Sequence, residues 1–188
     1  MARRIVPEIE ICSIGPRAGS IALASGLKVT AEFGIDDAPR CDLVIVTGGP
    51  GWPVQAQATA TLDYIRRVHA SGRIASVCTG GMILAASGIL DGGPATTKRE
   101  VVPPKISPLQ VMRATYPDIE VREAILVDRE GGLVTGGGVS LCIDTTLHLL
   151  ADMLGRHVAD ETARIMEYRR AWQANREGFA PVLAAPGT

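Results

Sequence analysis

Three short apolar segments of this chain each run into glycine, and this pattern restricts the fold more than any other feature. The three pairs of segment and glycine-rich end are 42–47 with 48–51, 73–77 with 78–81, and 133–135 with 136–138. Because helix-type sequence follows each pair, we expect a doubly wound, mostly parallel α/β sheet with helices on both faces. Ligands bind such sheets beyond the carboxyl ends of the strands, so the three glycine-rich ends should meet at one crevice.

The remaining periodicity places further elements along the chain. We predict strands over residues 8–14, 20–24, 27–33, 42–47, 73–77, 95–97, 119–127 and 133–135, and helices over residues 59–70, 79–86, 108–115, 140–154 and 160–177. Strand 42–47 should be buried on both faces because it is almost continuously apolar. We expect one domain over residues 1–178 and a loose tail over residues 179–188.

Composition narrows the class of protein. The chain has 46% hydrophobic but only 4% aromatic residues, which favours an aliphatic core of the parallel-sheet kind. A formal net charge of −1 gives no electrostatic case for nucleic acid or for an anionic membrane surface. The sequence contains neither an apolar run long enough to span a bilayer nor a signal-peptide core. We therefore expect a soluble, cytoplasmic protein.

The four cysteines are far apart in the sequence and form no C-x-x-C motif. This spacing suggests neither a zinc site nor a disulfide framework, and we predict no metal and no cofactor. Cys12, Cys41 and Cys142 lie within or next to apolar elements and are interpreted as structural. Cys78 differs from them because it stands between a strand and a helix.

Cys78 has the surroundings of a nucleophile elbow. A sharp strand-to-helix turn strains the backbone and crowds its neighbours, so small residues are needed two positions before and after, as Ser76 and Gly80 provide. A thiol at a helix N-terminus is also stabilised as thiolate by the helix dipole and the unpaired N–H groups. The alternative is a buried, inert cysteine, and the elbow alone leaves both readings open.

The glycine-rich ends suggest an oxyanion site beside this thiol. The backbone N–H of Gly48 or Gly49, together with that of Thr79, could stabilise negative charge developing on a substrate. Each glycine cluster taken singly is also compatible with an ordinary tight turn at a strand end.

Four motifs in order resemble the DJ-1/PfpI superfamily, whose fold is like that of class I glutamine amidotransferases. They are VTGGPG at residues 46–51, ASVCTG at 75–80, GILDG with ATT at 88–97, and VTGGGVS with ID at 134–144. Isonitrile hydratases and the N-terminal domains of AraC-type (GlxA-like) regulators share these features most closely. The resemblance implies a flavodoxin-like fold, a reactive Cys78 and a homodimer.

Site residues follow from that resemblance. In the hydratase branch the thiolate attacks the isonitrile carbon, and water then releases an N-substituted formamide. Carried over to this chain, Cys78 is the nucleophile, with a pocket and a rim around it. The pocket residues are Gly48, Gly49, Thr79 and Gly80, and the rim residues are Gly137, Gly138 and Lys98.

Two departures from the family pattern concern acid/base chemistry. No residue matches the family carboxylate that hydrogen-bonds the thiol, and residues 1–6 resemble only the tail of the helix that carries it. We therefore expect a start codon set too far downstream, a trimmed chain or a rearranged fold. Many relatives place a histidine where Lys98 stands, and PfpI-type proteases place one where Thr79 stands, which disfavours a protease.

Four other polar residues are interpreted as non-catalytic. His69, His148 and His157 lie on predicted helices away from the elbow and are read as surface or core residues. Asp144 is expected to stabilise the dipole of its helix.

Three functions fit these observations. The first is a cysteine-dependent hydratase or hydrolase of a small electrophile, and the second is a non-catalytic sensor domain related to the AraC-type regulators. The third is a redox-responsive protein in which Cys78 is oxidised to a sulfinic acid. The chain has no room for a helix-turn-helix module and no basic stripe, so it should not bind nucleic acid by itself.

Overall fold

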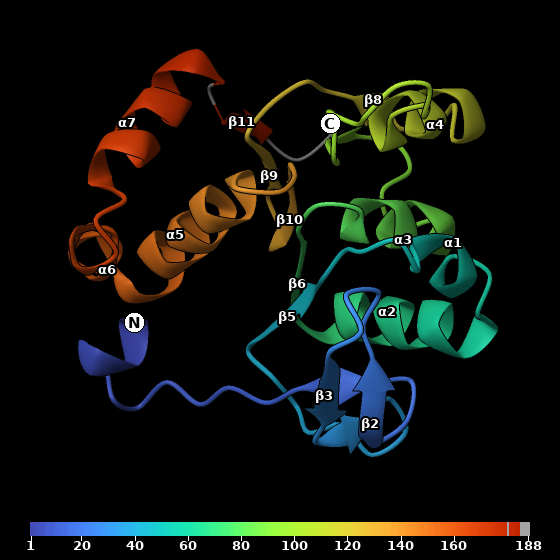
Figure 1. The fold of residues 1–188 in the computed structure, drawn as a ribbon, viewed down its shortest axis with the longest axis horizontal. Coiled ribbons are helices and arrows are strands. Elements are labelled where there is room, and N and C mark those ends of the chain that lie inside the picture. Colours follow the sequence, from blue (N-terminus) through green and yellow to red (C-terminus); the bar gives the residue numbers. More distant parts are fainter. Residues whose placement is uncertain (180, 185–188) are drawn as a thin grey trace.

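A five-stranded sheet forms the centre of the computed structural model, which describes residues 1–179 and 181–184 (Figure 1). In order across the sheet, the strands are β11 (Val182–Ala184), β9 (Leu126–Arg129), β10 (Leu133–Gly136), β6 (Arg73–Ser76) and β5 (Leu43–Val46). Neighbouring strands are parallel except β9 and β10, which are antiparallel. The predicted mostly parallel sheet is confirmed.

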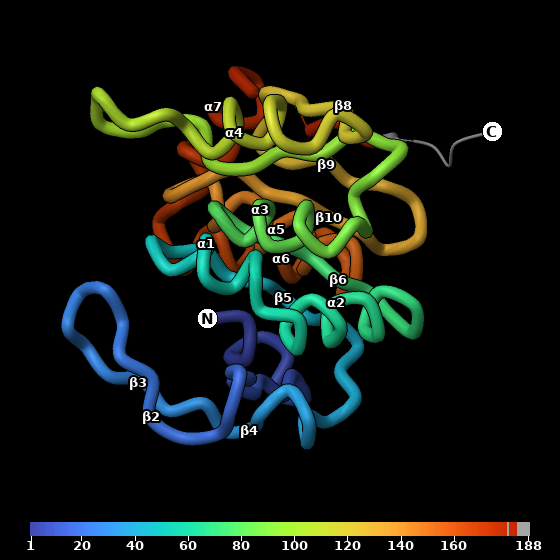
Figure 2. Tube along the Cα trace, turned by 90° about the vertical axis from the view of Figure 1, so that its right-hand side faces the viewer, coloured from blue at the N-terminus to red at the C-terminus, as the bar shows by residue number. Residues whose placement is uncertain are grey.

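Helices cover both faces of this sheet (Figures 1 and 2). One face carries α5 (Leu141–Leu154), α6 (Arg156–Ile165) and α7 (Arg169–Gly178), and the other carries α1 (Trp52–Gln55), α2 (Thr59–Ser71), α3 (Gly80–Ser87) and α4 (Pro108–Thr115). Successive side chains of β6 point to opposite faces of the sheet, because side chains alternate along a strand. Ile74 joins the core under α2 and α3, and Ala75 joins the core under α5.

Local signals in the sequence mark the start of α4 and the end of α3. Ser107 begins α4 with a reciprocal cap, in which its hydroxyl accepts the Gln110 N–H at 3.2 Å and the Gln110 side chain accepts the Ser107 N–H at 3.3 Å. Gly88 ends α3 with a φ of 82°, a conformation that glycine adopts without a steric penalty.

The single helix predicted over residues 160–177 is wrong. The chain breaks between α6 and α7, where Glu167 has a φ of 55°. This turn folds α7 back, so that Trp172 packs with Leu147 of α5 and Ala163 of α6. Burial of the Trp172 ring, which is only 7% exposed, favours the break over a continuous helix.

The N-terminal part contains less regular structure than predicted. The strand expected over residues 8–14 is reduced to β1 (Ile14–Gly15), paired with β4 (Phe33–Gly34), and η1 (Ala2–Arg4) is a short 3-10 helix. Residues 8–13 have no ladder partner among the described residues, and Ile11 is 73% exposed. The predicted ribbon over residues 20–33 is confirmed as the hairpin of β2 (Gly19–Ala22) and β3 (Lys28–Ala31).

Two other strands are shorter than predicted. Residues 95–97 contribute only Ala95 to β7 (Pro94–Ala95), because the Thr96 N–H donates to the Thr135 hydroxyl and the Thr97 hydroxyl donates to the Cys78 carbonyl. The strand predicted over residues 119–127 divides into β8 (Glu120–Val121), which pairs with β7, and β9 in the main sheet.

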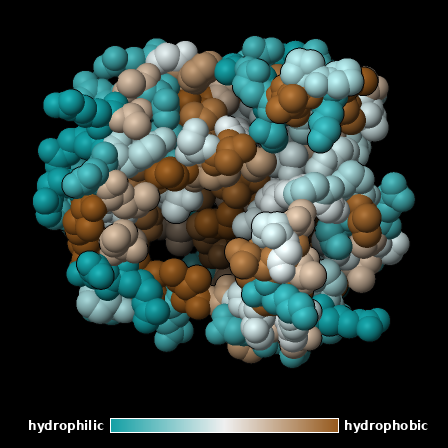
Figure 3. Space-filling model, viewed as in Figure 1, coloured by the Kyte–Doolittle hydropathy of each residue, from teal (hydrophilic) through white to brown (hydrophobic). Residues whose placement is uncertain are grey.

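The prediction that β5 is buried on both faces is also wrong. Within the described part of the chain, β5 pairs only with β6 and so forms an edge of the sheet, and Ile45 is 36% exposed. Figure 3 shows apolar side chains around a hollow in the middle of this side of the molecule. The absence of the family's first strand and helix, expected from the sequence, stays a prediction.

The segment predicted as a loose tail contains β11. Val182–Ala184 pairs in parallel with β9 and satisfies backbone groups that β9 would otherwise leave open. Residues 180 and 185–188 lie outside the described residues, and the division into one domain and a tail stays a prediction. No helix in the described part of the chain is long and apolar enough to cross a membrane.

Candidate active site

Cys78 occupies the turn between β6 and α3 in a strained backbone conformation. Its φ is 55°, which is unusual for a residue with a side chain. Two hydrogen bonds hold this geometry: the Cys78 N–H donates to the Gly137 carbonyl at 3.0 Å, and the Thr97 hydroxyl donates to the Cys78 carbonyl at 2.8 Å. The elbow expected from the sequence is therefore present, and the neighbouring strand end and Thr97 brace it.

Close packing explains why glycine stands on both sides of the elbow. A Cβ on Gly80 would lie 2.1 Å from the Val46 carbonyl oxygen. A Cβ on Gly48 would lie 2.5 Å from the Thr79 nitrogen and 3.0 Å from the Cys78 Cβ. The end of β5 thus lies directly against the start of α3, and this approach requires glycine.

The surroundings of Cys78 favour its thiolate form. They lower its pKa to about 6, mainly because the Cys142 thiol donates a hydrogen bond to the Cys78 sulfur. The Thr79 N–H, the positive charge of Lys98 and the Thr79 hydroxyl act in the same direction, whereas burial opposes them. At neutral pH the greater part of Cys78 is then thiolate, the nucleophilic form.

Cys142 is a site residue that the sequence interpretation missed. It lies in the first turn of α5, where its thiol is 3.7 Å from the Gly137 carbonyl that also accepts the Cys78 N–H. The hydrogen bond to Cys78 and burial raise the pKa of Cys142, so it stays protonated beside the thiolate. Its place just after the third glycine-rich strand end was the available signal, since that end was expected to meet the elbow.

Thr79 ties the glycine-rich end of β5 to the elbow. The Gly49 N–H donates to the Thr79 hydroxyl oxygen at 2.8 Å, and this hydroxyl lies 3.1 Å from the Gly49 carbonyl. The Gly49 N–H is therefore already donated. The candidate oxyanion donors are the Gly48 N–H and the Thr79 N–H, the second once the Cys78 sulfur has bonded to the substrate and no longer holds it as a thiolate. Their catalytic role stays a prediction.

The three predicted rim residues lie around Cys78. A Cβ on Gly138 would lie 3.0 Å from the Cys78 sulfur and 3.0 Å from the Lys98 Cβ. Gly137 accepts the Cys78 N–H through its carbonyl and donates its own N–H to Ile125 at 2.8 Å. The structure therefore brings Lys98 and both glycines together with the thiol.

Neither a histidine nor a carboxylate is among the described groups that shift the pKa of Cys78. His148 instead lies 2.7 Å from Asp128. Asp144 is only 1% exposed and accepts hydrogen bonds from the Tyr168 hydroxyl at 2.8 Å and from Asn175 at 2.9 Å. It joins α5 to α7, a role beyond the dipole effect expected from the sequence.

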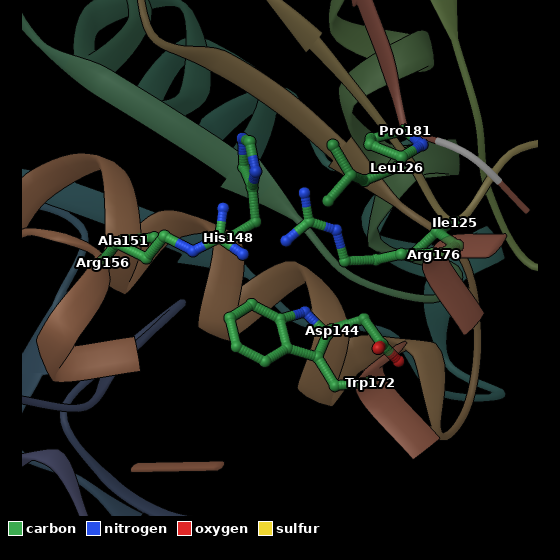
Figure 4. Close-up of a pocket in the computed structure, with 9 residues that line it drawn as sticks. All are labelled: Ile125, Leu126, Asp144, His148, Ala151, Arg156, Trp172, Arg176 and Pro181. Atoms are coloured by element: carbon green, nitrogen blue, oxygen red, sulfur yellow. The ribbon is translucent and has the colours of Figure 1, made fainter. Parts of the chain in front are cut away.

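A cavity of about 130 Å³ lies apart from the elbow, between β9, α5 and α7 (Figure 4). Its lining includes His148, Arg156, Trp172 and Arg176 but none of the predicted site residues. Among the described residues, no group of three or more histidine, cysteine or acidic side chains is placed to hold a metal ion. The chemistry of the elbow therefore has to be read from Cys78 and its immediate neighbours.

Comparison with known proteins agrees with this geometry. The model of the DJ-1/PfpI family matches residues 3–152. The chain belongs to the DJ-1/PfpI family. It is 29% identical over 170 residues to an isonitrile hydratase of Pseudomonas putida, covering 88% of this chain and 69% of that protein.

Regulators of the same family are also similar. The HTH-type transcriptional regulator GlxA of Rhizobium meliloti is 30% identical over 155 residues, which cover 81% of this chain but 45% of the regulator. The chain thus spans less than half of that regulator.

A solved structure with the same fold is a THiJ/PfpI family protein from Pseudomonas syringae. It has a TM-score of 0.73 and 23% identity, and the match covers 90% of this chain and 75% of that one. This likeness establishes the DJ-1/PfpI fold with its flavodoxin-like sheet.

Proposed function

We propose that this DJ-1/PfpI protein is a cysteine-dependent hydratase that adds water to a small electrophile, with isonitriles as the substrate class. The observation that carries the proposal is the strained elbow thiol with its pKa lowered to about 6. The similarity to an isonitrile hydratase supports the choice of substrate class.

The proposed reaction begins with the Cys78 thiolate. Its sulfur forms a bond to the terminal isonitrile carbon, and that carbon takes a proton to give a thioimidate. Water then adds to the carbon–nitrogen double bond, and the nitrogen takes a proton. The hydroxyl of the adduct gives up a proton, which replaces the one that the carbon took, and collapse breaks the carbon–sulfur bond, releases an N-substituted formamide and returns the thiolate. The net change is addition of one water to the isonitrile.

The neighbours of Cys78 have separate roles in this proposal. The N–H groups of Gly48 and Thr79 stabilise the oxyanion of the water adduct. Cys142 is a protonated thiol beside the reacting sulfur and is placed to supply the first proton. It would take the place of the carboxylate that the resemblance to the family implies. Lys98 adds positive charge that stabilises the resting thiolate.

Hydration of benzyl isonitrile by the purified protein tests this function. We expect N-benzylformamide to appear, detected by liquid chromatography, and Cys78→Ala and Cys78→Ser to abolish it while the circular dichroism spectrum stays unchanged. Cys41→Ser is the matched control, because Cys41 is also a half-buried thiol but lies outside the elbow. Unchanged turnover in both Cys78 variants would refute the role of the thiol.

A second candidate is a ligand-binding domain without turnover. The similarity to the GlxA regulator favours it, as does the lack of a carboxylate among the described groups that act on Cys78. In this case isonitriles or related small molecules raise the melting temperature without forming product, and Cys78→Ser leaves that shift in place. The first candidate requires product and the second does not, so one assay separates them.

We also propose that the protein is a cytoplasmic homodimer. The resemblance to the DJ-1/PfpI family supports the homodimer, and the four free cysteines fit a reducing compartment. Light scattering coupled to size-exclusion chromatography tests the assembly, for which a mass of twice 19.8 kDa is expected. Fractionation of the source cells tests the compartment.

A further inference from the structure

We propose that Cys142 is a resolving thiol, which forms a disulfide with Cys78 after a hydroperoxide has oxidised Cys78 to a sulfenic acid. The disulfide would turn the enzyme off reversibly and protect its nucleophile from irreversible oxidation. The inference rests on the reactive Cys78 of the proposed function but not on the identity of the substrate.

The two cysteines come from different strand ends and meet at one backbone segment. The Cys78 N–H and the Cys142 thiol both point to the Gly137 carbonyl, at 3.0 and 3.7 Å. The Cys78 sulfur also lies 3.0 Å from the position that a Gly138 Cβ would take. Both thiols therefore border residues 137–138, and each acts on the pKa of the other.

Both thiols are accessible as well as close. Cys78 and Cys142 are each only partly buried, so neither residue is sealed in the core away from a molecule as small as hydrogen peroxide. Cys142 stands in the first turn of α5. Its N–H donates to the carbonyl of Val139, a residue that is 68% exposed. A shift of this helix start would let the two sulfurs close to the roughly 2.05 Å of a disulfide bond.

The chemistry takes two steps and consumes one hydroperoxide. The Cys78 thiolate attacks one peroxide oxygen, the O–O bond breaks, and the leaving hydroxide takes a proton to become water. The sulfur of Cys142 then loses its proton and attacks the Cys78 sulfur, and the S–O bond breaks with release of a second water. Two thiols are oxidised to one disulfide, and hydrogen peroxide is reduced to two waters.

Oxidation of Cys78 makes the Cys142 thiol easier to deprotonate. The Cys78 thiolate is the main reason that the pKa of Cys142 is raised, through the hydrogen bond between the two sulfurs. A sulfenic acid carries no charge, so oxidation removes this effect. Cys142 then loses its proton more easily at the moment when Cys78 becomes the electrophile.

Peptide mapping by mass spectrometry tests the inference. The purified protein is treated with one equivalent of hydrogen peroxide, blocked with iodoacetamide and digested. We expect the peptides of Cys78 and Cys142 to be joined by a disulfide that dithiothreitol cleaves, with return of the free thiols. Because this assay uses no isonitrile, a failure to hydrate isonitriles would leave its result interpretable.

Two variants and a control sharpen the test. Cys142→Ser and Cys142→Ala should leave Cys78 to accumulate as sulfinic acid under excess peroxide, whereas Cys41→Ser should behave like the unchanged protein. Circular dichroism of each variant checks the fold, and Cys142→Ser keeps a polar group at the site if Cys142→Ala unfolds. Sulfinic acid on Cys78 of the unchanged protein without the disulfide, or no oxidation of Cys78, would overturn the inference.

Discussion

The protein brings its four cysteines together in two pairs, and the pairs have opposite acid–base character. The sulfurs of Cys12 and Cys41 lie 4.0 Å apart, near the start of β5. Burial, followed by the contact with Cys12, raises the pKa of Cys41. At the other end of the sheet, contact with Cys142 contributes instead to a lowered pKa of Cys78.

Besides the contact with the other sulfur, the groups around each thiol differ. Cys78 receives the Thr79 N–H at the start of α3 and faces the positive charge of Lys98. Cys41 is followed by the negative charge of Asp42, which raises its pKa further. Proximity of two thiols alone therefore does not make a nucleophile. At Cys78 a backbone donor and a cation at a helix start add to the hydrogen bond from Cys142.

The largest expected effect comes from breaking the elbow itself. Gly80→Ala places a Cβ 2.1 Å from the Val46 carbonyl, so β5 and α3 must separate, at a cost of roughly 3 kcal/mol of unfolding free energy. We expect a lower melting temperature by thermal unfolding and slower iodoacetamide alkylation of Cys78. Gly49→Ala is the matched control, because its Cβ meets no atom within 4 Å. Equal losses in both variants would contradict the packing argument.

Removal of the Cys142 thiol should reduce the difference between the pKa of Cys78 and the pKa of Cys41. Cys142→Ala deletes a hydrogen bond to a charged sulfur, which corresponds to roughly one to two pH units. The pKa of Cys78 should rise from about 6 by that amount. The pH profile of iodoacetamide alkylation measures it, because the rate follows the thiolate and its midpoint moves to higher pH. Cys142→Ser should restore part of the shift, and an unmoved midpoint in Cys142→Ala would be inconsistent with the assigned contact.

Lys98 should have a smaller influence on the same midpoint. Lys98→Met removes a positive charge that stabilises the thiolate, so the pKa of Cys78 should rise, by less than in Cys142→Ala. Salt screens charges that water reaches, so added salt should shrink the difference between the variant and the unchanged protein. Lys105→Met provides the control, since Lys105 does not act on Cys78. A salt-independent effect would point to packing instead of charge.

The smallest effect is expected at the other pair. Cys12→Ser removes only a lesser contribution to the raised pKa of Cys41, because burial is the main one. Cys41 should therefore still be alkylated more slowly than Cys78 at neutral pH, and Cys78 should be unaffected. Competitive alkylation followed by mass spectrometry compares the two thiols in one sample. A Cys41 that reacts as fast as Cys78 would remove the distinction between the pairs.

Local chemistry made much of the sheet and elbow predictable. Ser107 and Gly88 mark helix ends whose hydrogen bonds and φ values depend on neighbouring residues, and the elbow follows from small residues around Cys78. The N-terminal part was predicted less well, because the strand expected over residues 8–14 depends on a distant partner. The break at Glu167 was missed for a similar reason, since it depends on burial of Trp172 against α5 and α6.

The sequence by itself determined the class of fold, the family and the place of the reactive thiol, because each follows from short-range pattern and motif. Only the tertiary structure decided which groups act on that thiol. Cys142 is distant from Cys78 in the chain, and Thr97 and Gly137 brace the elbow from other strand ends. The pKa of a thiol depends on charges and donors within a few ångströms, and only folding brings those groups together.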